Sequence, residues 1–144
     1  MITIREARCD DASAINALAS TLGYPEQIEV MQARLEKIIA LADQLVVLAE
    51  DQNHVVCGWL TAHAFDTLAT GFRVQITGLV VSDKHRRMGI GRQLVARAEE
   101  WARTLGAKSV VVFSNVKRTE SHAFYPVVGY THTKTEAVYR KAID

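Results

Sequence analysis

Apolar residues recur along the chain at two spacings, one typical of amphipathic helices and the other of half-buried strands. Alternation predicts a first strand from Ile2 to Arg5. Two helices follow, because the apolar residues after Asp11 and after Pro25 recur every three or four positions. Pro25 suits the first turn of the second helix. The first helix can end at Gly23, and its apolar face consists of Ile15, Leu18, Ala19 and Leu22.

Apolar and β-branched runs predict further strands, and a helical spacing separates two of them. The strands are expected at Leu45–Ala49, Val55–Phe65, Arg73–Val81 and Ser109–Phe113. A helix opened by Gly89 and Gly91 is expected to stop at Gly106. After it come a short helix, Thr119–Tyr125, and one or two final strands within Thr131–Lys141.

This order of elements, β-α-α-β-β-β-α-β-α-β, combines a meander with one right-handed crossover unit. It predicts an α/β (α+β) fold, in which a mixed central sheet of about six to seven strands is flanked by about four helices. The chain has 144 residues, which is enough for one substantial core. We therefore expect a single domain that spans residues 1–144.

The composition excludes several kinds of protein but does not indicate a function. Hydrophobic residues make up 49%, charged residues 23%, and the net charge is +1, as in ordinary globular domains. No apolar run reaches membrane length, and no basic region precedes an apolar one at the N-terminus. Cys9 and Cys57 lack metal-ligand spacing and are expected to be buried free thiols. These features predict a cytoplasmic protein with no metal site and no membrane partner.

The richest chemistry lies between Leu79 and Leu94, where an apolar strand, a polar loop and a helix start follow one another. The first N–H groups of a helix lack partners and carry partial positive charge, so they favour an anion. Gly89 and Gly91 let a phosphate approach the backbone closely. Arg86, Arg87 and Arg92 add positive charge, which makes a diphosphate the expected guest.

Elimination narrows the kind of diphosphate ligand. A Walker loop would need Gly-Lys-Ser/Thr, which does not follow these glycines, and a dinucleotide fingerprint would need glycine where Leu94 stands. The pattern present is Arg-x-x-Gly-x-Gly, from Arg86 to Gly91. With Leu79-Val80-Val81 before it, this pattern resembles the acetyl-CoA-binding motif of the GNAT superfamily of N-acetyltransferases. The element order is also that of the GNAT fold, so the resemblance covers Ile2 to Lys141.

The resemblance implies acetyl-CoA as the cosubstrate. Backbone groups of Leu79, Val80 and Val81 would bind the pantetheine arm like an added strand, although their side chains can simply belong to the core. An N–H of the same strand edge would polarise the thioester carbonyl. The pyrophosphate would be held by Arg86, Arg87, Met88, Gly89, Ile90, Gly91 and Arg92.

The resemblance also assigns roles near the C-terminus. Tyr125 would be the general acid that protonates the departing thiolate, since an ordinary phenol with a pKa near 10 is protonated at neutral pH. Asn115, at a strand end, and Arg118, seven residues before Tyr125, are both candidates for contacts with the cosubstrate. Pro126 disfavours the α conformation at Tyr125, which can therefore lie at a helix end, and Tyr125 can alternatively be a core residue.

No general base is assigned. Related enzymes often place a glutamate on the strand before the cofactor loop, but Arg73–Val81 contains no carboxylate, and Gln75 cannot accept a proton at neutral pH. Glu50 ends its strand and Asp66 follows a longer one, and either could act through water or simply be a solvated surface charge. Three histidines are further candidates: His63, His85 and His122.

The sequence thus predicts an acetyl-CoA-dependent N-acetyltransferase acting on a primary amine of a small molecule or an amino-acid-like acceptor. In this fold acceptors commonly enter over the two N-terminal helices and the following hairpin, here around Leu22, Tyr24, Phe65 and Asp66. This region lacks the acidic cluster that an aminoglycoside site would need. Aminoglycosides, protein N-termini and lysines stay as alternative acceptors, and a homodimer is compatible with the sequence.

Two non-catalytic alternatives stay open. One is a CoA-binding regulator, because no base is evident. The other is a nucleic-acid-binding module that would use Lys84, His85, Arg86, Arg87 and Arg92 on phosphates. A nearly neutral chain with 7% aromatic residues argues against nucleic acid as a partner.

Overall fold

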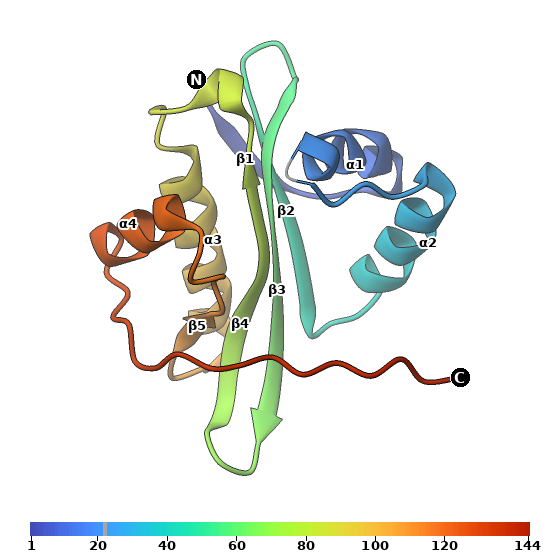
Figure 1. Cartoon of the computed structure of the whole chain (residues 1–144). Coiled ribbons are helices and arrows are strands. Elements are labelled where there is room, and N and C mark those ends of the chain that lie inside the picture. The colour runs from blue at the N-terminus through green and yellow to red at the C-terminus, as the bar shows by residue number, and fades with distance from the viewer. Residues whose placement is uncertain (22) are drawn as a thin grey trace. The chain divides into compact units, whose positions relative to one another are not determined.

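The computed structural model describes residues 1–21 and 23–144, and it divides the chain into two compact units, Met1–Phe113 and Ser114–Asp144. The described residues of the first unit form a five-stranded sheet and three α-helices (Figure 1). The elements are β1 (Thr3–Glu6), α1 (Ala12–Thr21), α2 (Ile28–Ile39), β2 (Gln44–Glu50), β3 (Val56–Thr67), β4 (Gly71–Val81), α3 (Ile90–Leu105) and β5 (Val110–Val112). Two 3-10 turns, η1 (Cys9–Asp11) and η2 (Asp83–His85), complete it.

The strands lie in the order β1-β2-β3-β4-β5. The first four form an antiparallel meander, whereas β5 pairs in parallel with β4. Parallel neighbours need a crossover, and α3 supplies it between β4 and β5. Pairing with β3 extends along the whole of β4, from Gly71 to Val81, but β5 pairs only with Val74–Ile76. The C-terminal part of β4, after Ile76, therefore extends beyond β5.

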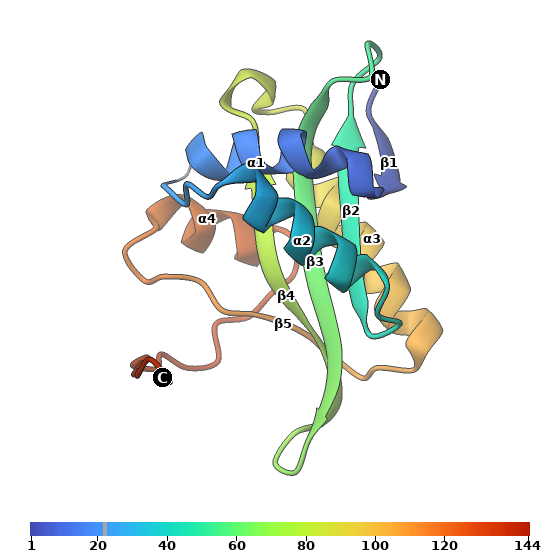
Figure 2. The ribbon, with the colours of Figure 1, turned by 90° about the vertical axis from the view of Figure 1, so that its right-hand side faces the viewer.

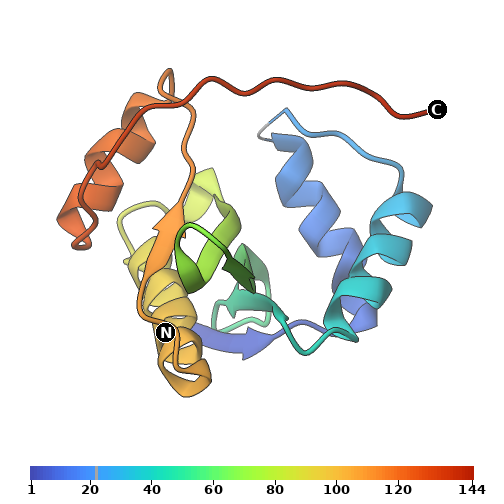
Figure 3. The ribbon, with the colours of Figure 1, turned by 90° about the horizontal axis from the view of Figure 1, so that it is seen from below.

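Helices cover both faces of the sheet. Figure 2 shows α1 and α2 in front of the strands with α3 behind them, and Figure 3 shows the same layers from below. On the α1/α2 face, Val46 and Leu48 of β2 pack with Ile15 and Leu35 of the helices and with Trp59 of β3. On the other face α3 buries a stripe with helical spacing, which consists of Ile90, Leu94, Val95, Ala98 and Ala102.

The second unit contains one α-helix among its residues, α4 (Thr119–Val127). Pro126 lies inside its last turn, so the helix continues two residues past Tyr125. Proline has no N–H to donate, which fits a position where the helix is about to end. The predicted helix is therefore present, with Tyr125 in its last turn.

The predicted fold class is confirmed, but the strand number was too high. The expected strands within Thr131–Lys141 are absent, because residues 130–144 form neither helix nor strand. Every residue from 131 onward is exposed, and a segment without a pairing edge or a buried face gains too little to hold an extended ladder. The sheet thus has five strands instead of six or seven.

Three smaller predictions also need comment. Pro25 precedes α2, which begins at Ile28 with Gln27 as its N-cap, so the helix starts three residues later than expected. Both cysteines are free, but only Cys57 is buried and Cys9 is exposed. Leu22, expected on the apolar face of the first helix and near the acceptor, lies outside the described residues.

Candidate active site

The end of β4 offers an open strand edge. Leu79, Val80 and Val81 pair with β3 on one side, whereas none of the described residues forms a strand against their other side. Backbone N–H and C=O groups at such an edge can pair with an extended chain. The pantetheine arm predicted from the sequence is a ligand of this shape, so the structure leaves these three residues available for it.

A bulge marks the point where β4 leaves β5. Thr61 pairs with Gly78 and Ala62 with Ile76, so Thr77 is the extra residue of β4. The Thr77 and Thr61 hydroxyls are hydrogen-bonded at 2.8 Å. A Cβ on Gly78 would come within 2.7 Å of the Trp59 ring, so only glycine fits there without a shift. Sequence reasoning missed this feature, although a lone glycine inside a strand signals a bulge or a close approach.

The loop after β4 has an unusual backbone. Arg87 has a φ of 67° and Gly89 a φ of 73°, so two residues of this loop are left-handed. Gly89 is the N-cap of α3, which begins at Ile90. Left-handed residues in short loops help successive N–H groups form anion-binding concavities, and the first N–H groups of α3 lie next to them. The backbone is therefore suited to a phosphate, as the glycine motif predicted.

The positively charged side chains around this loop differ in whether they form ion pairs. Arg86 makes an ion pair with Asp83, with Nη2 at 2.6 Å from Oδ1. Arg87, Met88 and Arg92 are exposed, and within the described part of the chain Arg87 and Arg92 make no ion pair. These two arginines, together with the exposed Lys84 of η2, are available positive charges around the loop and the start of α3.

His85 fastens the loop to the turn between β2 and β3. Its Nε2 lies 3.3 Å from Oδ2 of Asp51, and both side chains are 18% exposed. The backbone N–H groups of Val55 and Asn53 bind Asp51 and, with His85, lower the pKa of its carboxyl group. Nδ1 of His85 is buried without a hydrogen-bond partner among the described atoms. His85 thus holds the loop and is not placed to take a proton from an acceptor.

The second unit carries the other predicted site residues. The Oδ1 of Asn115 accepts a hydrogen bond from Lys117 N at 2.9 Å, and its backbone O accepts one from Arg118 N. Asn115 thereby shapes the turn before α4, whose N-cap is Arg118. Burial raises the pKa of the Tyr125 phenol, and the nearby Arg118 charge only partly offsets this rise. Tyr125 is therefore a protonated phenol at neutral pH.

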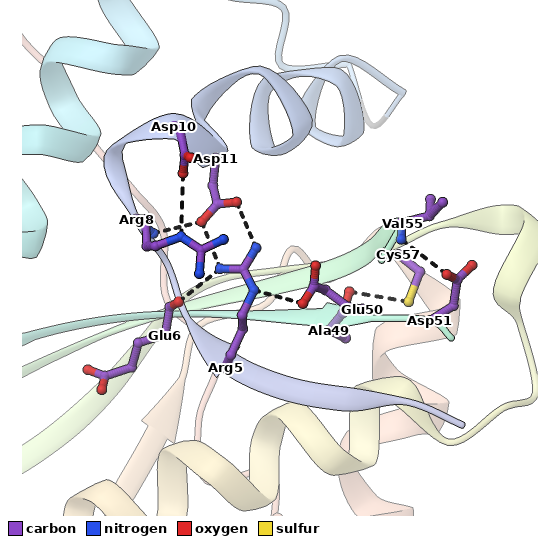
Figure 4. A network of polar contacts seen from close by, with 10 residues as sticks. All are labelled: Arg5, Glu6, Arg8, Asp10, Asp11, Ala49, Glu50, Asp51, Val55 and Cys57. Atoms are coloured by element: carbon purple, nitrogen blue, oxygen red, sulfur yellow. Dashed lines mark hydrogen bonds and ion pairs between the residues drawn. The ribbon is translucent and has the colours of Figure 1, made fainter. Parts of the chain in front are cut away.

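Glu50 can be removed from the base candidates. Figure 4 shows Arg5 between two carboxylates: its Nε lies 2.8 Å from Oε1 of Glu50, and its Nη1 and Nη2 bind both oxygens of Asp11 at 2.9 and 2.8 Å. The hydrogen bond from Arg5 is the main reason why the pKa of the Glu50 carboxyl group is lowered. A hydrogen bond from Arg5 is also the main cause of the lowered pKa of Asp11. A carboxylate held in this way is a poor proton acceptor, and its role is to join β1 to β2.

Polar residues gather on the α1/α2 face near the bulge. Directly opposed residues of neighbouring strands share a face of the sheet, so a row of pairs can be followed from Leu48–Trp59, where Leu48 is buried and Trp59 partly buried. The row continues through the pairs Val46–Thr61, Gln44–His63 and His63–Gln75. Phe65 and Arg73 form the next pair of the row. Asp66 is exposed on the opposite face by the same alternation. We call the polar members Gln44, Thr61, His63, Arg73 and Gln75 the polar row, beside which Phe65 lies.

Two absences bear on the expected chemistry. Among the described residues, no three His, Cys, Asp or Glu side chains are grouped as metal binding would require. None of the described helices combines the length and apolar character needed to cross a membrane.

An open strand edge beside a helix start that follows left-handed residues has the geometry suited to an extended arm carrying a phosphate. The model of the acetyltransferase (GNAT) family matches residues 11–130. The chain belongs to this family, which confirms the resemblance predicted from the sequence, and acetyl-CoA is the family's acetyl donor.

Relatives and solved structures agree with this assignment. The chain is 38% identical over 80 residues to an aminoalkylphosphonate N-acetyltransferase of Salmonella typhimurium, a match covering 55% of this chain and only about half, 52%, of that protein. It is 22% identical over 147 residues to an aminoglycoside N(6')-acetyltransferase type 1 of Acinetobacter baumannii, covering 99% and 98%. Its fold matches AAC(6')-Iy in complex with a CoA-linked bisubstrate analogue, with a TM-score of 0.88 and 20% identity over 99% of both chains.

Proposed function

We propose that this chain transfers the acetyl group of acetyl-CoA to the primary amine of a small, amino-acid-like molecule. The observation that carries the proposal is the open edge of β4 beside the left-handed loop and the start of α3. The edge suits the pantetheine arm, and the loop suits the pyrophosphate.

In this proposal each group has one task. Acetyl-CoA supplies an activated acyl group. Backbone groups of Leu79, Val80 and Val81 hold the arm, and an N–H of this edge polarises the thioester carbonyl. The loop residues from Arg86 to Arg92 hold the pyrophosphate. Tyr125 protonates the thiolate as it leaves, with Asn115 and Arg118 near the cosubstrate.

Arg73 supports an acceptor that carries an anionic group. It is half-buried in the polar row, and its Nε is buried without a hydrogen-bond partner among the described residues. Leaving such a donor unpaired costs about 1–3 kcal/mol, and a carboxylate or phosphonate could satisfy the guanidinium with paired hydrogen bonds. Arg73 also precedes the bulge residue Thr77 by four positions, about 13 Å along β4, a distance that its long side chain can shorten.

An acceptor panel tests the proposal through CoA thiol release. The panel contains aminoalkylphosphonates, amino acids, simple alkylamines, aminoglycosides and peptides with free N-termini. We expect the highest kcat/KM with amines that carry a phosphonate or carboxylate. The relative named for aminoalkylphosphonates makes these the first compounds to try. No thiol release with any amine would contradict the proposed transferase activity.

Arg73→Gln separates the acceptor class from the chemistry. A charge-assisted hydrogen bond contributes about 1.5–3 kcal/mol, so KM for an anionic amine should rise roughly tenfold to a hundredfold while kcat changes little. KM for a neutral-tailed alkylamine should stay the same. Arg103→Gln is the matched control, because Arg103 is an exposed arginine near the end of α3, where it pairs with Glu100. Equal KM values for both kinds of amine in Arg73→Gln would refute an anionic acceptor group.

Aminoglycosides are the second candidate acceptor. The supporting observation is that the aminoglycoside relative matches along nearly the whole chain, although at 22% identity. Polycations, however, would meet Arg73 and His63 in the polar row. Preference for an aminoglycoside over every anionic amine of the panel would select this candidate.

We also propose that the protein is cytoplasmic, is able to form a homodimer, and binds neither nucleic acid nor membranes. Two free cysteines support a reducing compartment. Titration with acetyl-CoA and with duplex DNA separates a transferase or CoA-binding regulator from a nucleic-acid-binding module, and light scattering gives the oligomeric state.

A further inference from the structure

The transfer needs a proton acceptor that β4 does not provide. A primary amine resembling a lysine side chain has a pKa near 10.4, so it is mostly an ammonium at neutral pH and cannot attack a carbonyl. The part of β4 from Arg73 to Val81 contains no carboxylate. Glu50 is bound by Arg5, Asp66 is on the other face, and the second ring nitrogen of His85, Nδ1, is buried away from any acceptor.

His63 lies at the required level of the sheet. It is opposite Gln75, within the stretch of β4 that β5 covers, Val74–Ile76, and just before the bulge at Thr77. The distance from the His63 Cα to the bulge is about 8 Å, because the bulge lies one strand across and two residues further along. An imidazole side chain with one bound amine or one water molecule spans that distance.

Two neighbours, Asp43 and Phe65, contact the His63 ring. Nε2 lies 3.4 Å from Oδ2 of Asp43, and the ring stacks on Phe65 with centroids 4.8 Å apart and 24° between the planes. Asp43 is itself held beside β3, because its backbone O accepts a 2.8 Å hydrogen bond from Ala64 N. A carboxylate facing Nε2 favours the tautomer in which Nε2 carries the proton and Nδ1 is the acceptor.

The surroundings of His63 are compatible with proton transfer to solvent. The side chain is 33% exposed, and within the described residues Nδ1 has no hydrogen-bond partner. The neighbouring strands present uncharged side chains beside it, Gln44 on β2 and Gln75 on β4. The charged groups that face it from neighbouring segments are Asp43, on the turn before β2, and Arg73, further along β4.

We propose that His63 is the general base of the acetyl transfer and that Asp43 is its positioning residue, an inference that rests on the proposed function. The acceptor ammonium gives one proton to Nδ1 of His63, directly or through one water molecule. The freed nitrogen pair forms the C–N bond, the C–S bond breaks, and Tyr125 gives its proton to the departing thiolate. The second nitrogen proton is released to water, from which Tyr125 takes back the one that it gave. The products are the amide and the CoA thiol, and His63 returns its proton to water.

The test compares His63→Gln with the wild type across pH, using the best acceptor of the panel. General base catalysis contributes roughly 10²–10⁴-fold, so kcat/KM of the variant should fall by about a hundredfold near neutral pH. The loss should shrink at high pH, where the amine deprotonates without help, and the acidic limb of the wild-type profile should change. Asp43→Asn should lower kcat/KM in the same direction but less, since it removes only the support of the tautomer.

Two controls keep the outcome specific. His132→Gln makes the same chemical change at an exposed residue of the second unit and should leave kcat/KM unchanged. Titration should give His63→Gln the acetyl-CoA affinity of the wild type. Wild-type turnover with an unchanged pH profile in His63→Gln would overturn the assignment of His63 as the base. A loss of kcat/KM that is independent of pH and accompanied by weaker acetyl-CoA binding would overturn it too. Neither result would contradict the proposed transferase activity. A wild-type enzyme that binds acetyl-CoA but acetylates no amine would instead overturn the proposed function, and the base with it.

Discussion

At the scale of single residues, partners decide which side chains are available for chemistry. Glu50 and His85 had the right functional groups for a base, yet Arg5 binds the Glu50 carboxylate, and Nδ1 of His85 is buried while its Nε2 faces Asp51. Tyr125 is in the opposite situation, because burial raises the pKa of its phenol. A raised pKa keeps the proton on the oxygen, as a proton donor requires.

Tyr125→Phe tests the donor role. The change keeps the ring and its edge contacts with Phe124 and Tyr130, whose centroids lie 5.1 and 5.9 Å away. We expect kcat to fall by about tenfold to a hundredfold, at the low end for general acid catalysis because a thiolate is already a fair leaving group. Acetyl-CoA affinity should change little.

The pH profile of the same variant gives a second readout. Activity that depends on a protonated phenol is lost as pH rises through its pKa, and here the pKa lies above the ordinary tyrosine value. The basic limb should therefore lie at high pH in the wild type and be absent in Tyr125→Phe. Tyr139→Phe, at a 93% exposed position, is the matched control. Wild-type kcat and an intact basic limb in Tyr125→Phe would exclude the hydroxyl as proton donor.

At the scale of elements, the helix that follows the glycine motif was the most predictable part of the chain. Glycine caps with positive φ bound α3 at both ends, Gly89 and Gly106, and its buried residues keep the helical spacing. Glycine caps and helical spacing can both be recognised within the sequence of a single element, without knowledge of its neighbours. The bulge at Thr77 and the polar row depend instead on the register between β3 and β4, which no single segment specifies. The sequence therefore predicted the glycine-capped helix start but not the face of the sheet that His63 and Arg73 share.

The start of α3 supports one prediction of its own. Gly91 lies in the first turn of the helix, where the free N–H groups are expected to face the pyrophosphate. Gly91→Val should raise the Kd for acetyl-CoA about tenfold or more, equivalent to losing at least one charge-assisted hydrogen bond. Valine is a better helix former than glycine, so the melting temperature should not fall much.

Gly91→Ala provides the graded control for this substitution. Its single methyl group should weaken acetyl-CoA binding less than the valine does, while the far-ultraviolet circular dichroism of both variants stays the same. Calorimetric titration measures the affinities. Equal affinities for wild type, Gly91→Ala and Gly91→Val would mean that the pyrophosphate lies away from this turn.

At the scale of the whole molecule, one ion-pair cluster joins segments that are distant in the sequence. Arg5 of β1 contacts Asp11 before α1 and Glu50 at the end of β2, and Asp11 also accepts a 2.7 Å hydrogen bond from Arg8 N. Neither a motif nor a spacing announces this cluster, because its members become neighbours only when β1 and β2 pair. From the sequence alone Glu50 is therefore a candidate base, because its role in joining β1 to β2 exists only in the folded chain.

Asp11→Asn should lower the free energy of unfolding at pH 7 by about 2 kcal/mol, because Arg5 loses a partner in a largely buried pair. The native pKa of Asp11 lies below 3.8, so its stabilising effect is complete above that pH and is lost as pH falls through the native pKa. The difference between variant and wild type should therefore shrink below about pH 4. Urea unfolding at several pH values measures it.

Asp10→Asn is the matched control, since Asp10 makes an exposed, 3.6 Å ion pair with Arg8. Exposed pairs contribute about 0–1 kcal/mol, so the control should stay close to the wild type at every pH. A destabilisation of Asp11→Asn that persists undiminished at pH 3 would show that packing, rather than the charge on Asp11, accounts for it.

The open edge of β4 also affects how the protein behaves without its ligand. Unpaired strand edges are templates on which strands of other chains can add, and they are a common origin of aggregation. The segment Leu79–Val81 is apolar and β-branched at two positions, so its free edge has little of its own to deter such pairing. A bound CoA arm would cover this edge while also stabilising the folded state by mass action. Cellular acetyl-CoA would then act on this protein as a small-molecule chaperone as well as a reactant.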